Sequence, residues 1–190
     1  MRLASFIGLG GVLLAGAVSA QDPDAGRQVA GMCRTCHGID GLAQIPVAPN
    51  IGGEPASYLA GQLEAFRSGA RVNEMMSVVA AGLTDQQIAD VAAWYASQVV
   101  IAVPPQGFDA TAAPELCAAC HGADGIALNE DAPNLAGENT IYIGMQLKAF
   151  GSGKRVHDVM TGIAEGLSDD EIRAVSEWYA GIGLKTDRAE

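Results

Sequence analysis

The chain has 190 residues, is 49% hydrophobic but only 5% aromatic, and carries 11 lysines and arginines against 22 aspartates and glutamates, a formal net charge of −11. This acidity argues against a nucleic-acid partner, because a surface that follows phosphates should be basic. The length fits one large domain or two small ones, and the charge either steers the protein towards a basic patch on a partner or serves solubility alone.

The first 20 residues are typical of a secretory signal peptide. Met1-Arg2 gives a charged start, Leu3 to Val18 is apolar, and Ser19-Ala20 places small residues before a polar segment. We predict cleavage after Ala20 and a periplasmic mature protein. An uncleaved membrane anchor is the alternative, but the apolar stretch is short and rich in glycine.

A short first helix is predicted over about residues 25–35, and it leads into the pentapeptide Cys33-Arg34-Thr35-Cys36-His37. The Cys-x-x-Cys-His pattern is the attachment signature of a c-type haem. Each of the two thiols adds to one vinyl group of the haem. His37 is then held under the iron as its proximal ligand.

Two more helices are predicted in the same half of the chain. A middle helix fits residues 56–67, whose large apolar residues recur on one side. A last helix begins at the capping box Thr84-Asp85-Gln86-Gln87, and its apolar residues keep helical spacing through Trp94 and Tyr95. No stretch shows the convincing alternation of a strand.

Residues 99–113 are predicted to form a linker. They contain Pro104-Pro105-Gln106-Gly107, and we expect the segment to be neither helical nor part of a sheet. The segment therefore separates a first domain, residues 21–98, from a second, residues 114–190.

The second domain repeats the first without a gap. Cys117-Ala118-Ala119-Cys120-His121 follows the first pentapeptide at an offset of 84 residues (117 minus 33), and roughly half of the aligned positions match. A period this long with only two copies indicates a duplicated domain. Pro114 lies close to the second motif, so we expect a shorter helix before it.

The repeat also selects a second axial ligand for each iron. Methionine is common in this role and raises the potential of a haem. Met75 and Met76 are both candidates, but Met76 pairs with Met160 at the same offset, whereas Met75 pairs with Val159. Core packing is the usual role of a methionine. The matched positions favour Met76 and Met160 as iron ligands.

Two other pairs of residues matched by the repeat each have two possible roles. Pro49 and Pro133 each lie twelve residues after a proximal histidine, where a carbonyl would accept from the ring or the proline would simply form a turn. Arg71 and Arg155 would pair with haem propionates or remain solvated. His157 pairs with Asn73, so we expect a surface histidine that binds no iron.

Three other uses of the cysteines explain the pattern less well. A shared four-cysteine zinc site would not need two complete repeats. A thioredoxin-like motif would need a βαβ setting, which the sequence does not predict. Two disulfides would leave the adjacent histidines and the matched methionines unexplained.

Each half resembles class I cytochrome c, through Cys-x-x-Cys-His-Gly-x-Asp-Gly, Ala-Pro-Asn, Tyr-x-x-x-Gln-Leu-x-Ala-Phe and Met-x-x-x-Ala-x-Gly-Leu-[Ser/Thr]-Asp. The tandem arrangement is similar to the dihaem cytochrome c4 family. This resemblance implies an all-α fold of two tandem class I cytochrome c domains, packed about a pseudo-twofold axis with the haems close together. The loop before each methionine is short for this family, which affects the expected shielding of the propionates.

The resemblance also implies two covalently bound haem c groups and a set of ligands. One haem is held by Cys33, Cys36, His37 and Met76, and the other by Cys117, Cys120, His121 and Met160. The implied role is a periplasmic electron carrier that works between respiratory partners such as a quinol–cytochrome c oxidoreductase and a terminal oxidase, with only peripheral association with the membrane through these partners.

Two other roles are weighed against this one. The chain would instead be the cytochrome subunit of a flavocytochrome-type dehydrogenase, for example a sulfide-oxidising one, with the flavin on a separate flavoprotein chain. A dihaem peroxidase would need an open axial position, which the matched methionines argue against. We therefore expect an electron carrier and not an enzyme.

Overall fold

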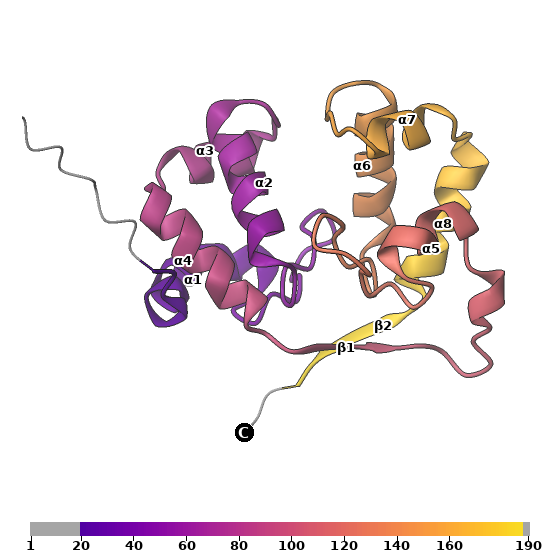
Figure 1. Cartoon of the computed structure of the whole chain (residues 1–190), viewed down its shortest axis with the longest axis horizontal. Helices are drawn as coiled ribbons and strands as arrows, with labels where there is room; N and C mark the ends of the chain where they lie inside the picture. The colour runs from indigo at the N-terminus through magenta and orange to yellow at the C-terminus, as the bar shows by residue number, and fades with distance from the viewer. Residues whose placement is uncertain (1–19, 188–190) are drawn as a thin grey trace, which may run out of the picture.

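The computed structural model describes residues 20–187, which form two helical units above a two-stranded ribbon (Figure 1). The predicted signal peptide lies outside the described residues except for Ala20. No helix within residues 20–187 combines the length and apolar character needed to cross a membrane.

The first unit consists of four helices, α1 (Pro23–His37), α2 (Ala56–Ser68), α3 (Glu74–Ala81) and α4 (Asp85–Ala96). Helix α1 begins where the Asp22 carboxylate accepts from two backbone N–H groups of the first turn. The capping box predicted at Thr84 and Gln87 is present at the start of α4. Helix α1 crosses α4 at Gly26, where a Cβ atom would lie only 1.9 Å from the Asp90 carbonyl oxygen, so the crossing requires glycine.

The second unit repeats these helices as α5 (Glu115–His121), α6 (Thr140–Gly151), α7 (Met160–Glu165) and α8 (Asp169–Ala180). Helix α5 has seven residues where α1 has fifteen, and Pro114 is its N-cap, as predicted. The second capping box, at Ser168 and Glu171, is also present. The mainly helical class expected from the sequence is confirmed.

The expectation that residues 99–113 contain neither helix nor strand is wrong. β1 (Val100–Val103) pairs antiparallel with β2 (Gly183–Thr186), and a 3-10 turn, η1, covers Ala110–Ala112. The four-residue strand is too short to show a clear alternation, and its partner lies at the far end of the chain. The ribbon holds the end of the second unit against the segment that leaves the first.

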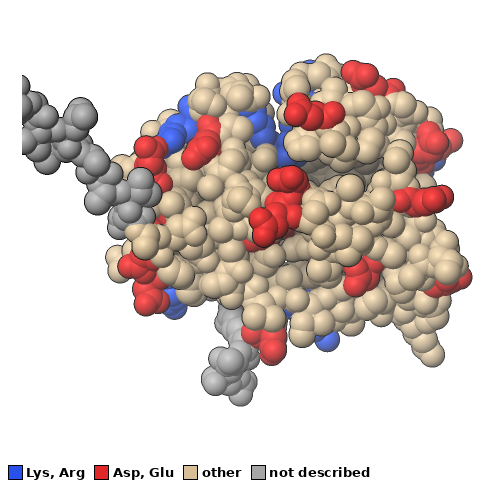
Figure 2. Space-filling model, in the orientation of Figure 1, with Lys and Arg blue, Asp and Glu red and all other residues tan. Residues whose placement is uncertain are grey.

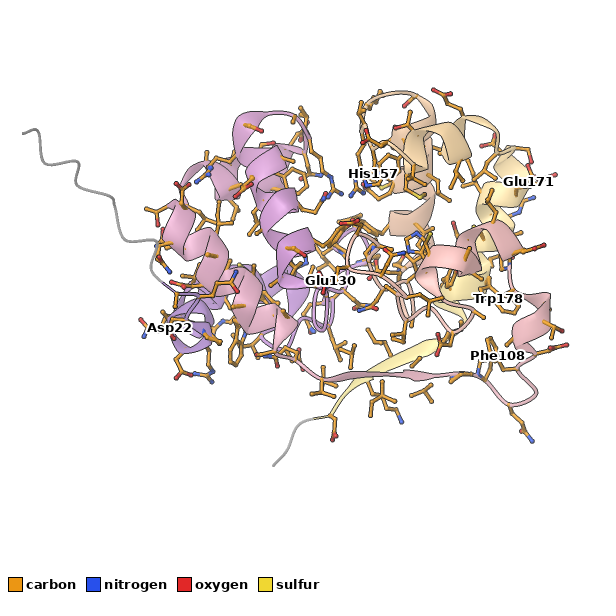
Figure 3. The ribbon with its side chains drawn as sticks, in the orientation of Figure 1. Asp22, Phe108, Glu130, His157, Glu171 and Trp178 are labelled. Atoms are coloured by element: carbon orange, nitrogen blue, oxygen red, sulfur yellow. The ribbon has the colours of Figure 1, made fainter. Side chains whose placement is uncertain are left out.

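Each unit has its own core. In the first, Ala30 of α1, Leu59 of α2 and Val91 of α4 are buried together. In the second, α6 and α8 supply most of the core, and Tyr179 and Ile182 are almost fully buried. Phe108 lies beside Trp178, with ring centroids 5.3 Å apart, so the connecting segment covers one side of this unit (Figure 3).

Candidate functional site

The two predicted proximal histidines have matching geometry. His37 ends α1 and His121 ends α5, and both are 7% exposed. Their Nδ1 atoms lie 2.9 Å from the Pro49 carbonyl oxygen and 2.8 Å from the Pro133 carbonyl oxygen. A carbonyl only accepts, so Nδ1 carries the proton and Nε2 keeps its lone pair. The carbonyl role, which spacing alone left open, is confirmed.

Burial lowers the pKa of both His37 and His121. The neutral imidazole is therefore favoured, and this is the form that binds iron. The contact with the proline carbonyl fixes the orientation of the ring. Each ring thus presents an unprotonated Nε2 to the interior of its unit.

The turn after each histidine is held by aromatic residues of the last helix. The Tyr95 hydroxyl donates to the Gly38 carbonyl and the Tyr179 hydroxyl to the Gly122 carbonyl, both at 3.1 Å. Trp94 and Trp178 donate from Nε1 to the next carbonyl in each copy. The sequence predicted that Trp94 and Tyr95 lie on a helix but contained no sign of these hydrogen bonds.

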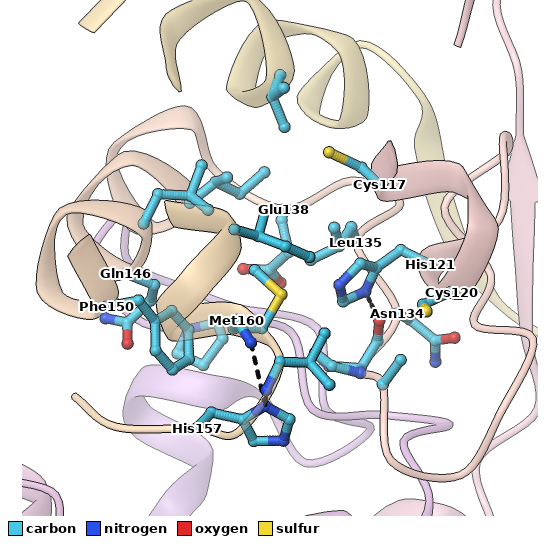
Figure 4. A pocket seen from close by; sticks show the side chains of 18 of the residues that line it. Cys117, Cys120, His121, Asn134, Leu135, Glu138, Gln146, Phe150, His157 and Met160 are labelled. Carbon is cyan, nitrogen blue, oxygen red and sulfur yellow. Dashed lines mark hydrogen bonds between the residues drawn. The ribbon is translucent and has the colours of Figure 1, made fainter. Parts of the chain in front are cut away.

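A cavity of about 290 Å³ opens in front of His121 (Figure 4). Its lining is mainly apolar and includes Leu147 and Phe150 of α6. The Met160 thioether points into this cavity towards the His121 ring, and Cys117 and Cys120 border it. The structure therefore brings together the four residues predicted to hold the second haem.

The two methionines begin corresponding helices. Met76 lies in the first turn of α3 and Met160 begins α7, and both are half-buried, whereas Met75 is 64% exposed. The Asn73 side chain accepts from the backbone N–H groups of Met75 and Met76. In the second unit the Nδ1 atom of His157 accepts from Val159 and Met160 in the same way.

His157 is exposed, as predicted, but it also has a local role. Its ring replaces the Asn73 amide as the acceptor at the start of the methionine helix. The pairing of these two residues in the repeat was the available signal, since asparagine is a common N-cap.

The geometry fits haem c. The four cysteines are unpaired and lie in two separate helices, α1 and α5, in different units. In the second unit, the thiols, the imidazole and the thioether surround one apolar cavity. A buried carboxylate oxygen that borders this cavity, Glu138 Oε2, has no hydrogen-bond partner among the described residues. This unpaired oxygen is available for a hydrogen bond to a polar group of a molecule bound in the cavity.

Arginines from both units meet at the interface. Gln62 and Gln146 each accept from Arg71 and from Arg155 at 2.6–2.8 Å. Each guanidinium also lies 4.4 Å from the centroid of a phenylalanine ring of its own unit. Arg71 is 9% exposed, so of the two roles that the sequence left open, that of a solvated arginine is excluded for this residue. Among the ion pairs of the described residues, none includes either arginine.

Two buried glutamates also form hydrogen bonds across the interface, and no pattern in the sequence predicted a role for them. Glu54 accepts from the backbone N–H of Asn134 at 3.0 Å, and Glu138 from that of Asn50 at 2.5 Å. Both glutamates are 3% exposed, and burial raises the pKa of each to about 8. The repetition of Gly-Glu at the 84-residue offset was the only available signal.

The sequence is similar to a family model and to several known proteins. The model described as cytochrome c matches residues 23–98. A thiosulfate dehydrogenase electron acceptor from Stutzerimonas stutzeri is 36% identical over 177 residues, which cover 80% of each chain. Cytochrome c4 from Thiocapsa roseopersicina is 35% identical, covering 88% of this chain and 96% of that protein.

Solved structures give the same match. Reduced recombinant cytochrome c4 from Pseudomonas stutzeri has a TM-score of 0.73 at 28% identity, covering 86% of this chain and 100% of its own. Thiosulfate dehydrogenase (TsdBA) from Marichromatium purpuratum has a TM-score of 0.72 at 32% identity, covering 84% of this chain but only 40% of the longer chain. The likeness to these proteins therefore extends over both units.

Proposed function

The chain belongs to the cytochrome c4 family of dihaem electron carriers, and we propose on this basis that it carries electrons in the periplasm between two redox proteins. The observation that carries the proposal is the repeated set of two thiols, one imidazole and one thioether, one set in each helical unit. Haem c, when bound, supplies an iron that alternates between the ferrous and ferric states.

The residues of the chain hold that group in a fixed environment. Cys33 and Cys36 would tether it in the first unit, and Cys117 and Cys120 in the second. The neutral rings of His37 and His121, each fixed by a proline carbonyl, would bind its iron through Nε2.

In this proposal the thioethers of Met76 and Met160 would be the second protein ligands of the two irons. Phe150 and Leu147 exclude water from the second site. With the two histidines and the two methionines as ligands, a bound haem would have no position left for a substrate, and its surroundings would change little between the two oxidation states. We therefore propose a carrier that catalyses no bond chemistry of its own.

The arginine pair supports a role in binding the propionates. Arg71 and Arg155 lie together at the interface, and their described hydrogen-bond partners are neutral amides and hydroxyls. Two neighbouring positive charges favour an anion, and a guanidinium binds a carboxylate with two parallel hydrogen bonds. We propose that these two arginines would bind propionates of the haem groups.

The surface favours a basic partner. Acidic side chains are spread over much of the face in Figure 2, in keeping with the net charge of −11. Opposite charges accelerate the encounter of redox proteins and make it sensitive to salt. We propose a partner whose docking face is rich in lysine and arginine.

Two kinds of donor fit this proposal. The likeness to cytochrome c4 supports a carrier between a quinol-oxidising complex and a terminal oxidase. The likeness to a thiosulfate dehydrogenase electron acceptor supports a carrier that takes electrons from a separate dehydrogenase. The flavocytochrome-type subunit is a variant of this second role.

Stopped-flow mixing tests the proposed function. The reduced protein should transfer two electrons per chain to an oxidase or to a model basic acceptor, with a rate that falls as salt is raised. The oxidised protein, mixed with a purified thiosulfate or sulfide dehydrogenase and its substrate, distinguishes the two donors. Rapid peroxide turnover, or carbon monoxide binding to the native reduced protein, would contradict a carrier with both axial positions filled.

A further inference from the structure

One peptide group in each unit has a hydrogen bond at both of its ends. The carbonyl of Pro133 accepts from the His121 ring, and the N–H of Asn134, in the same peptide group, donates to the Glu54 carboxyl of the other unit. The distances are 2.8 and 3.0 Å. The proximal histidine of the second unit is thus connected to a side chain of the first through a single amide.

The reverse connection is also present. The Pro49 carbonyl accepts from the His37 ring at 2.9 Å, and the Asn50 N–H donates to Glu138 of the second unit at 2.5 Å. Glu54 lies just before α2 and Glu138 just before α6, so the two connections are related by the repeat.

The asparagine side chains hold these peptide groups in place. Asn134 donates from Nδ2 to the Gly53 carbonyl at 3.1 Å, and Asn50 donates to the Gly137 carbonyl at 3.0 Å. Each asparagine Oδ1 also accepts from a backbone N–H within its own unit at 2.9 Å. The peptide therefore has little freedom to rotate away from the glutamate or the imidazole.

An acceptor at the N–H end of an amide affects its carbonyl end. Hydrogen bonds in a chain polarise one another, most strongly where water is excluded. A stronger carbonyl acceptor draws the Nδ1 proton away from the ring and makes Nε2 a better electron donor. A better donor stabilises the ferric state, which lowers the potential of the iron.

We propose that Glu54 and Glu138 are positioning residues that act across the interface, Glu54 on His121 and Glu138 on His37, so that each unit sets part of the potential of the other unit's haem. This inference rests on the proposed function, because it requires that the two histidines bind iron. Docking of the units then affects the redox properties of both sites as well as their stability.

Leucine at each glutamate in turn tests the proposal in the full-length holoprotein. Glu54→Leu keeps the volume but leaves the Asn134 N–H without its acceptor. It should raise the midpoint potential of the second haem and move that of the first much less. Glu138→Leu should raise the midpoint potential of the first haem and move that of the second much less. Glu54→Gln keeps an acceptor, so both potentials should stay close to those of the wild type.

Potentials are read by optical redox titration, with the two haems distinguished by the NMR signals of their axial methionine methyl groups. A larger shift of the haem in the glutamate's own unit, equal shifts of both haems in both variants, or no shift would overturn the proposal. Equal shifts would indicate a general loosening of the interface.

Two further measurements separate a failure of this proposal from misfolding of a variant and from a failure of the proposed function. If Glu54→Leu does not fold, hydrogen exchange of the ring N–H groups in Glu54→Asp decides, because the shorter side chain withdraws the acceptor from the Asn134 N–H. The proposal requires a larger change at His121 than at His37, and an equal change overturns it. Haem content is determined for the wild type and each variant. A wild-type protein without two haems per chain contradicts the proposed function, whereas two haems with unshifted potentials contradict only the role of the glutamates.

Discussion

Arg71 and Arg155 come from opposite units, yet they donate to the same two amide oxygens, those of Gln62 and Gln146. Tyr142 and Tyr58 add one hydroxyl acceptor each, at 3.2 and 3.3 Å. Burial raises the pKa of Tyr58 to about 12, so its hydroxyl remains protonated and neutral. The arginines, glutamines and tyrosines therefore form a symmetric polar network across the interface, and the arginines carry its positive charge.

Replacing Arg71 with methionine should destabilise the holoprotein. The substitution removes three hydrogen bonds, two of them to the other unit, and a loss of about 2–3 kcal/mol in the free energy of unfolding follows from bonds to a charged donor. Denaturant unfolding followed by haem absorbance measures this. Arg71→Lys should rescue little, because an ammonium cannot make the same fork of bonds. Wild-type stability in the lysine variant would count against the network.

Replacing Met76 or Met160 with alanine should lower the potential of one haem and let an external ligand bind to it. In the proposed assignment the removed thioether is an iron ligand of the kind that raises the potential, and its loss would open a position on the iron. Optical redox titration with and without carbon monoxide measures both effects. Met75→Ala is the matched control, since Met75 is exposed and should affect neither haem. Two unchanged haems in Met160→Ala would refute the assignment of that ligand.

The buried glutamates predict a loss of stability at alkaline pH. Burial raises the pKa of Glu54 and Glu138 from an ordinary 4.5 to about 8, so the folded protein holds these protons more tightly than the unfolded chain does. The stability that they contribute is fully present below about pH 4.5 and is lost as the pH rises through about 8.

Unfolding by denaturant between pH 5 and pH 9 tests this dependence. The free energy of unfolding should fall less steeply with pH in Glu54→Gln than in the wild type, because glutamine cannot ionise. The exposed Glu64 on α2 provides a control, and Glu64→Gln should keep the wild-type slope. A Glu54→Gln curve parallel to that of the wild type would show that this carboxyl does not titrate in the range.

Removing the Tyr179 hydroxyl should weaken the second unit. Tyr179→Phe leaves the Gly122 carbonyl without its 3.1 Å donor next to the proximal histidine, and an unsatisfied buried acceptor costs about 1–3 kcal/mol. Tyr95→Phe is the matched change in the first unit. Denaturant unfolding should show a similar loss for both variants, and a loss within experimental error for either would contradict the role of the hydroxyl.

Much of the fold followed from the repeat and from local signals. The capping box at Thr84 marked the start of α4, the repeat carries it to Ser168 at the start of α8, and Pro114 marked the short α5. These features depend on residues within one turn of each other. The β1–β2 pair was missed because its strands are four residues long and lie far apart in sequence.

The parts of the site that could be predicted from the sequence are those whose residue pattern is compatible with few other roles. Cysteine pairs followed by histidine, and methionines matched by the repeat, pointed directly to iron ligation. The glutamate connections were not foreseeable, since Glu54 and Asn134 meet only when the two units dock. Most arginines in proteins are exposed to solvent. Arg71 is buried because the two units dock against each other, and a sequence pattern does not predict that contact.

The most direct measurement is the haem content of the purified protein, combined with a redox titration. Protein from a cell that matures c-type cytochromes should contain two covalent haems per chain, both with filled axial positions and both titrating reversibly. A colourless protein, or one with a single haem per chain, would contradict the account.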